Sequence, residues 1–148
     1  MMVQGLAQLK RKLTATIPAK VETATRKAME KGADELVGMM KRLVPVEDGD
    51  LRDSIGWTWG NAPKGSVVMA ESAADSRGLK ITVYAGNERT MVENSRGVRF
   101  QIARLQEHGT QAMEANPFFF PSWRALRKRI QSRIKREMKK AIKSESAQ

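Results

Sequence analysis

The 148-residue sequence contains no cysteine and a single histidine, His108. The absence of cysteine excludes a disulfide framework, a thiol nucleophile and a cysteine-based zinc site. One histidine argues against a multi-histidine metal site or a Ser-His-Asp triad within one chain. No apolar run approaches the roughly 20 residues that span a bilayer, and the first residues lack the apolar stretch of a signal peptide. We therefore expect a soluble intracellular product that does not enter membranes.

Acidic side chains are few relative to basic ones, 16 against 27, which gives a formal net charge of +11. The excess is uneven, because residues 1–43 carry +5, residues 44–120 carry −2 and residues 121–143 carry +9. An apolar share of 41% is sufficient for a hydrophobic core. A chain of this length fits one domain, which we assign to residues 1–148.

The N-terminal part has the hydrophobic periodicity of a helix, and we assign residues 1–43 to a helical arm. Pro18 interrupts the pattern and is suited to the first turn of a second helix. Pro45 ends the arm, because the residue before a proline is pushed out of the helical region. Gly49 lies in the following acidic turn and is free to adopt a positive φ.

The middle of the chain has the alternation typical of strands, and residues 53–86 predict an antiparallel meander. Polar residues 87–99 predict a surface loop, and residues 100–108 a short helix with Gly109 as its left-handed C-cap. The strands of the meander are expected at Ile55–Asn61, Val67–Ala70 and Leu79–Ala85.

A second long helix is predicted over residues 122–143, with Ser122 as its N-cap, followed by a frayed tail at 144–148. The predicted fold class is therefore α+β. An antiparallel sheet of three or more strands packs against a long N-terminal helix and a basic C-terminal helix.

No set of residues predicts catalysis or a cofactor. The carboxylates at 47, 48, 50 and 53 lack the ligand at the twelfth position of an EF-hand, so a solvated turn is favoured. The glycines at 56, 60 and 65 do not form a phosphate-binding loop. His108 beside Glu107 has no nucleophile or second titratable partner, which favours a hydrogen-bonding role at a helix end. We expect no enzyme activity, cofactor, metal or small-molecule substrate.

The basic C-terminal helix has two interpretations. Its charge suits phosphate contacts with release of counterions, but only Trp123 interleaves it as an aromatic, and no known nucleic-acid-binding motif accompanies it. The alternative is a solvated face or one that pairs with an acidic protein. The candidate contacts for DNA or an acidic partner are Arg124, Arg127, Lys128, Arg133, Lys135 and Lys139.

Three segments together resemble one protein family. The run from Val44 to Ile55, VPVEDGDLRDSI, resembles the "aPvdTGxLrxSI" signature of the HK-ninety-seven gene-product-ten family of tailed-phage tail-completion proteins. Tyr84-Ala85 and the later EHGT of residues 107–110 resemble its "YAxxvExGT" segment, here split by residues 86–106. NPFFFPSW at 116–123 resembles its "xPFlrPA" entry into the last helix.

The resemblance implies a structural virion protein at the tail end or head–tail neck, assembled in the host cytoplasm. Family members act as tail terminators or tail-completion proteins in a ring, commonly a hexamer, between the tail tube and the head-closure or connector protein. DNA then passes through the lumen without sequence-specific binding. Because a lumen lined with this much positive charge would retain DNA, we expect most of the basic helix to face protein or solvent.

The family motif also implies structural roles for individual positions. We expect Gly49→Val to impair folding or ring formation, and deletion of the 86–99 loop to weaken partner docking. The competing hypothesis is a stand-alone nucleic-acid-binding module. The positions with an implied structural role are Pro45, Gly49, Leu51, Ser54, Ile55, Gly109, Thr110, Pro117, Phe118 and Pro121.

Overall fold

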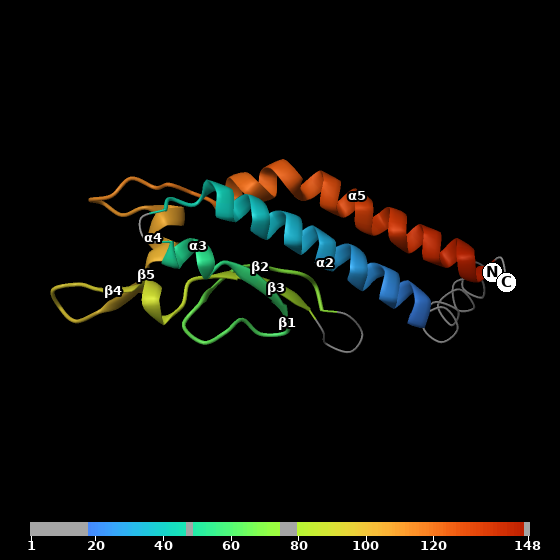
Figure 1. Ribbon diagram of the computed structural model, residues 1–148, viewed down its shortest axis with the longest axis horizontal. Coiled ribbons are helices and arrows are strands. Elements are labelled where there is room, and N and C mark those ends of the chain that lie inside the picture. Colours follow the sequence, from blue (N-terminus) through green and yellow to red (C-terminus); the bar gives the residue numbers. More distant parts are fainter. Residues whose placement is uncertain (1–17, 47–48, 75–79, 147–148) are drawn as a thin grey trace, which may run out of the picture. The chain divides into compact units, whose positions relative to one another are not determined.

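The computed structural model describes residues 18–46, 49–74 and 80–146 (Figure 1). The predicted helix before Pro18, the carboxylates Glu47 and Asp48, and the predicted strand start at Leu79 lie outside these residues. The chain divides into two compact units. We call residues 33–127 the mixed unit and residues 1–32 with 128–148 the helical unit, and each is described by itself.

The mixed unit contains a three-stranded antiparallel sheet made of β1 (Gly56–Trp59), β2 (Val67–Glu71) and β3 (Ile81–Ala85). The strand order is β1-β3-β2, so the predicted meander is wrong. β3 takes the centre because it is the most buried strand, with four of its five residues buried, whereas β1 and β2 are partly exposed. Both β1 and β2 are therefore edge strands, and β2 carries a register shift between Val68 and Ala70.

The second half of α2 (Pro18–Leu43) lies over this sheet (Figure 1). It contributes Leu36 and Met40 to the core, and Met40 is fully buried. The indole Nε1 of Trp57 on β1 donates to Asp34 Oδ1 at 2.7 Å, which fastens the sheet to the helix. The remaining core of the mixed unit comes from Ala33, Val44, Leu51, Ile55, Ile81, Val83, Ala85, Ala103 and Phe118.

The segment predicted as a loop at 87–99 is folded, so that prediction is wrong. It contains η2 (Glu88–Thr90) and β4 (Met91–Glu93), and β4 pairs with β5 (Arg99–Gln101) in an antiparallel hairpin. Its strands are three residues long, too short for a hydrophobic alternation that sequence patterns reveal. The predicted helix at 100–108 begins at Ile102 instead, as α4 (Ile102–His108).

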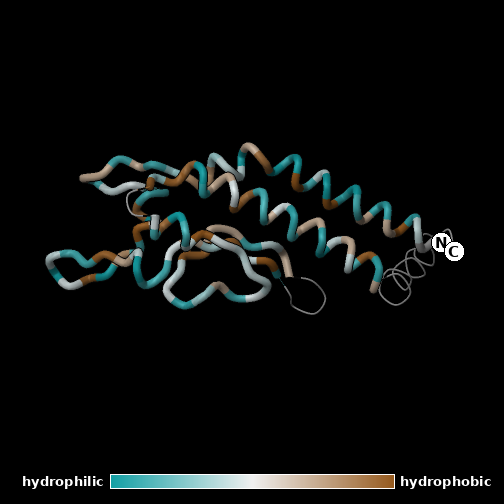
Figure 2. The backbone as a smooth tube through the Cα atoms, in the orientation of Figure 1, coloured by the Kyte–Doolittle hydropathy of each residue, from teal (hydrophilic) through white to brown (hydrophobic). Residues whose placement is uncertain are grey.

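The C-terminal helix α5 (Phe119–Ser146) begins three residues before the predicted N-cap. Ser122 is therefore inside the helix, where its hydroxyl donates to the carbonyl of Phe118 at 2.6 Å. The helix also continues beyond residue 143, so the tail predicted at 144–148 is helical up to Ser146. Hydrophobic residues recur along both long helices, and hydrophilic ones dominate the second half of α5 (Figure 2).

The helical unit pairs the first half of α2 with the second half of α5 in antiparallel directions. Lys20 Nζ donates to Ser144 Oγ at 2.9 Å near one end, and Gly32 faces Ile130 near the other. A Cβ on Gly32 would lie 2.8 Å from Ile130 Cγ2, so the glycine permits the close approach of the helices. Together, the two units confirm the α+β class with an N-terminal helix, an antiparallel three-stranded sheet and a C-terminal helix.

Candidate assembly surfaces

The turn after α2 is set by the first part of the family motif. Gly49 has φ 87° and ψ −5°, a left-handed conformation that disfavours side chains. It precedes α3 (Asp50–Asp53), from which Leu51 enters the core, and Ile55 is buried directly after it. Pro45 is half-buried just after the end of α2. The predicted positive φ of Gly49 is therefore confirmed.

Ser54 connects this turn to the sheet. Its buried hydroxyl donates to the carbonyl of Leu51 at 2.6 Å and accepts the N–H of Gly86, at the end of β3, at 2.8 Å. A buried hydroxyl needs partners for its donor and its acceptor, and here both are satisfied. The serine of the motif thus joins two segments that lie 32 residues apart in sequence.

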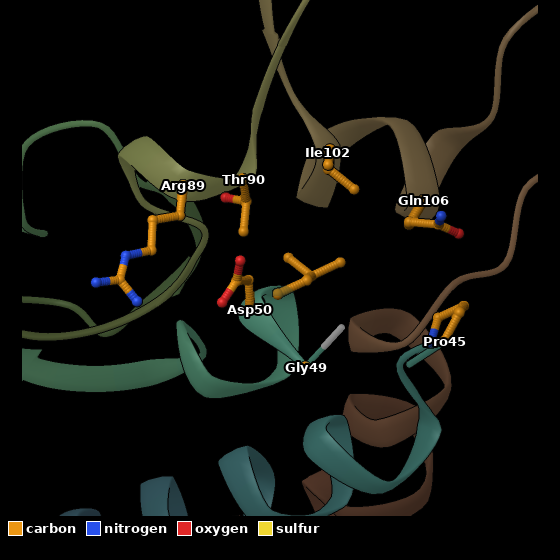
Figure 3. A pocket seen from close by; sticks show the side chains of 8 residues that line it. Pro45, Gly49, Asp50, Arg89, Thr90, Ile102 and Gln106 are labelled. Atoms are coloured by element: carbon orange, nitrogen blue, oxygen red, sulfur yellow. The ribbon is translucent and has the colours of Figure 1, made fainter. Parts of the chain in front are cut away.

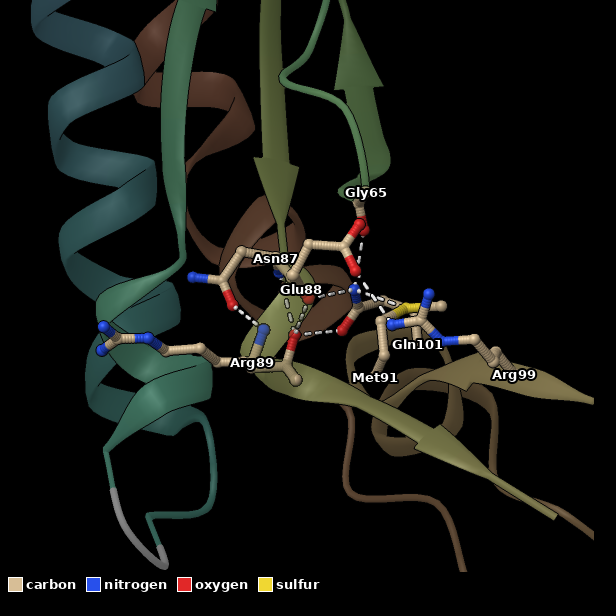
Figure 4. Close-up of polar contacts among 8 residues, drawn as sticks. Gly65, Asn87, Glu88, Arg89, Met91, Arg99 and Gln101 are labelled. Carbon is tan, nitrogen blue, oxygen red and sulfur yellow. Dashed lines mark hydrogen bonds and ion pairs between the residues drawn. The ribbon is translucent and has the colours of Figure 1, made fainter. Parts of the chain in front are cut away.

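A second polar connection holds the base of the β4–β5 hairpin (Figure 4). The Nε2 of buried Gln101 donates to the carbonyls of Gly65 at 2.8 Å and Asn87 at 3.1 Å. Its Oε1 accepts from the hydroxyl of Thr90, which is also buried. Sequence reasoning missed Gln101, because nothing in its local pattern indicates partners at Gly65 and at the η2 turn.

The side chain of buried Glu107 accepts three backbone hydrogen bonds in the mixed unit. Its Oε1 accepts the N–H groups of Phe118 and Phe119 at 3.0 and 2.8 Å, and its Oε2 accepts that of Phe120 at 3.1 Å. The side chain thus caps the N-terminus of α5 from the end of α4. A carboxylate there satisfies amides without a helical partner and complements the helix dipole. Sequence reasoning considered Glu107 as a neighbour of His108 and as part of the EHGT segment of the family motif, but it did not predict this cap.

The loop after α4 follows the second part of the motif. Gly109 has φ 74° and ψ 179°, so its φ is positive as predicted, but its ψ differs from that of a left-handed cap. Its N–H donates to the Leu105 carbonyl at 2.7 Å. The hydroxyl of Thr110 accepts the amides of Ala112 and Met113 at 3.2 and 2.9 Å.

The third part of the motif leads into α5. Phe118 is fully buried, whereas Pro117 is exposed and Pro121 is half-buried. Of these three residues, to which the family motif implies a structural role, only Phe118 is thus fully inside the core. The ring of Phe118 packs in the core while its backbone N–H donates to Glu107, so this residue takes part in both the core and the cap of α5.

A small cavity of about 70 Å³ lies between the α3 turn, η2 and α4 (Figure 3). It is lined by residues that include Gly49, Asp50, Thr90 and Gln106. Small-molecule sites usually occupy about 300–1,000 Å³, so this cavity suits packing rather than a ligand. Among the described residues there is no cluster of three or more metal-binding side chains, and no helix long and apolar enough to cross a bilayer.

The β4–β5 hairpin carries an exposed apolar face. Val92 and Phe100 lie directly opposite each other in the ladder and are 39% and 40% exposed. Val98 is two residues before Phe100, hence on the same face, and is 48% exposed. We call these three residues the hairpin face.

A second exposed apolar surface lies beside the edge strand β2. A hollow of about 350 Å³ is lined by residues of β2, α4 and the start of α5. Its apolar side chains include Val68 and Phe120, which are 48% and 53% exposed, and its polar side chains are Arg104, Glu107 and His108. We call this surface the β2 hollow. It differs in shape and composition from the hairpin face.

The six predicted basic contacts are divided between the two units. Arg124 and Arg127 belong to the mixed unit, where the Arg124 guanidinium lies 5.0 Å from the centre of the Phe120 ring. Arg133 is half-buried. Lys128, Lys135 and Lys139 are exposed on the helical unit at spacings of seven and four residues. Arg136 and Lys140, absent from the predicted set, are exposed beside them.

Comparison with known proteins gives one family. A family model described as "Bacteriophage HK97-gp10, putative tail-component" matches residues 7–109. The match covers more than two thirds of the chain and ends at Gly109, before α5. No curated protein matches the chain, and no solved structure does.

Proposed function

The chain belongs to the HK97-gp10-like family of bacteriophage tail components, and on that premise we propose that it forms a ring at the tail end or head–tail neck. A tail component is a structural part of the virion. In the proposed assembly, six copies close the ring between the tail tube protein and the head-closure or connector protein. DNA passes through the lumen without being read in sequence, and the chain acts without catalysis or cofactor.

The hairpin face is the observation that carries this proposal. It exposes three large apolar side chains on a two-stranded hairpin, a structure that is marginal in water without further packing. The β2 hollow and the edge strands β1 and β2 provide different surfaces on the same unit. Two unlike surfaces make heterologous contacts, and these close into a ring when the rotation allows.

The structure also defines how the predicted loop deletion is best made. Removal of residues 86–99 would delete Gly86 and Thr90, which are bonded to Ser54 and Gln101. Replacing residues 94–97 with Asn-Gly removes the native hairpin tip, keeps a short connection between the paired residues Glu93 and Arg99, and retains Gly86, Thr90 and Gln101. We expect this variant to keep its fold and to lose docking to partner protein, as measured by circular dichroism and by pull-down with tail tube or connector protein.

The ring itself is tested by native mass spectrometry of the full chain and of Phe100→Ser. We expect a discrete oligomer for the full chain and a monomer or small oligomer for the variant, because a serine removes apolar area from the hairpin face. Val46→Ser is the matched control, since Val46 is 53% exposed but lies outside both apolar surfaces. A monomeric wild-type chain at all concentrations would overturn the proposal.

A further inference from the structure

We propose that the outer face of α5 in the helical unit binds duplex DNA through its phosphates, independently of base sequence. The face consists of Lys128, Lys135, Arg136, Lys139 and Lys140, and we call it the basic face. This inference goes beyond the proposed ring, because a ring around DNA requires no affinity for it. It also concerns a helix beyond the end of the family match at Gly109.

The five side chains share one side of α5. All are exposed, and at about 100° per residue they span roughly 140° of the helix circumference. Ile130 and Ala141, which are buried, lie on the opposite side. The face is about 18 Å long, because residues 128 to 140 rise by about 1.5 Å each. This length is comparable to several phosphate steps along a duplex.

The electrostatic environment of the basic face is strongly positive. Within the described part of the chain, none of its five side chains makes an ion pair. Glu137, the one acidic residue between 121 and 143, is half-buried and lies roughly 160° or more from Lys128, Lys135 and Lys139 around the helix. It lies roughly 100° from Arg136 and 60° from Lys140. The surrounding unit, residues 1–32 and 128–148, contains 15 basic and 4 acidic residues. Neighbouring charges therefore reinforce the face.

The choice of residues favours phosphate over an acidic protein. Four of the five are lysines, and lysine is depleted at protein–protein interfaces, where arginine is enriched for its planar, bidentate pairing. Lysine is a strongly hydrated point charge that binds phosphate without a fixed geometry. A surface adapted to carboxylates of a defined partner would be expected to use more arginine.

Binding is expected to ignore base sequence and to be weak. No aromatic residue follows Trp123, so the basic face offers no platform for base stacking. Contacts to phosphates alone give dissociation constants of about 10⁻⁴–10⁻⁶ M at physiological salt. Such an affinity leaves DNA free to move, which removes the objection that a basic surface would retain it.

The proposal is tested by fluorescence anisotropy with a labelled mixed-sequence duplex of about 30 base pairs over a salt series. Five phosphate contacts predict a slope of about −4.5 for log K against log salt, hence about 500-fold weaker binding at 200 mM than at 50 mM. The variant K128Q/K135Q/K139Q should reduce the slope to about −1.8, because three contacts are lost. Glutamine is a good helix former, so circular dichroism should be unchanged.

The matched control is K64Q/R89Q/R96Q, which removes the same charge from exposed positions of the mixed unit. It should retain the wild-type slope. Equal loss in both variants would show that net charge acts without a site and would overturn the proposal. Polyglutamate that displaces the duplex at equal charge concentration would identify the face as a site for acidic protein instead, and would also overturn it. Native mass spectrometry of both variants keeps ring formation separate from DNA binding.

Discussion

The two units of the chain differ more in charge than in any other property. The mixed unit has 12 basic and 12 acidic residues and no net charge, whereas the helical unit carries the entire +11. The charge division inferred from sequence placed +5 and +9 at the two ends, and the fold brings those ends into one unit. The basic composition of this protein is thus a property of the helical unit alone, because the mixed unit, which contains the sheet, has no net charge.

The units also differ in how they are held together. The mixed unit has a core of large apolar residues and three buried polar connections, at Ser54, Gln101 and Glu107. The helical unit pairs two helices through small residues, among which Gly32 allows direct contact with Ile130. Substitutions at these points should therefore act on one unit and spare the other, and the following predictions test that independence.

The largest effect is expected from Glu107→Ala. The change leaves three backbone amides at the start of α5 without their acceptor, and the loss of bonds to a charged group costs about 2–4 kcal/mol. Hydrogen exchange should rise in the mixed unit and change little at 130–143. Glu107→Gln retains one acceptor oxygen and should cost about half as much. Equal exchange increases in both units would contradict their independence.

The second-largest effect is expected from Gly49→Val. We expect it to lower the free energy of unfolding by about 1–3 kcal/mol, as measured by urea denaturation. The cause is backbone strain, because a β-branched residue is disfavoured at φ 87°. Space is not limiting, since the nearest atom to an added Cβ is Arg52 Nη2 at 3.4 Å. Gly49→Asn is the control, because asparagine tolerates this conformation. If both variants were equally unstable, strain would not be the cause.

The smallest effect on the free energy of unfolding is expected from Gly32→Ala, because two contributions to stability oppose each other. Alanine favours the helix by about 1 kcal/mol, but its Cβ would overlap Ile130 and cost about 1–3 kcal/mol. The net expectation is a destabilisation of about 1 kcal/mol, measured by thermal unfolding. Gly38→Ala on the same helix meets nothing within 4 Å and should stabilise by about 1 kcal/mol. Stabilisation by both would mean that α2 and α5 do not need close approach.

Sequence reasoning succeeded where the cause is local. Pro18 begins α2, Gly49 has its positive φ, and the three strands lie close to where alternation placed them. It failed where the structure of a segment depends on contacts with residues that are distant in sequence. The central place of β3 depends on burial in the assembled sheet, and α5 begins at Phe119 because Glu107 caps it from α4, so that Ser122 is not needed as a cap.

The central position of β3 has a consequence for synthesis on the ribosome. β1 and β2 emerge first, and each finds its pairing partner only when residues 81–85 have left the exit tunnel. Neither strand pair of this sheet can therefore form before β3 has emerged. Until then, β1 and β2 have unpaired edges, and such edges make an incomplete chain prone to aggregate with neighbouring chains.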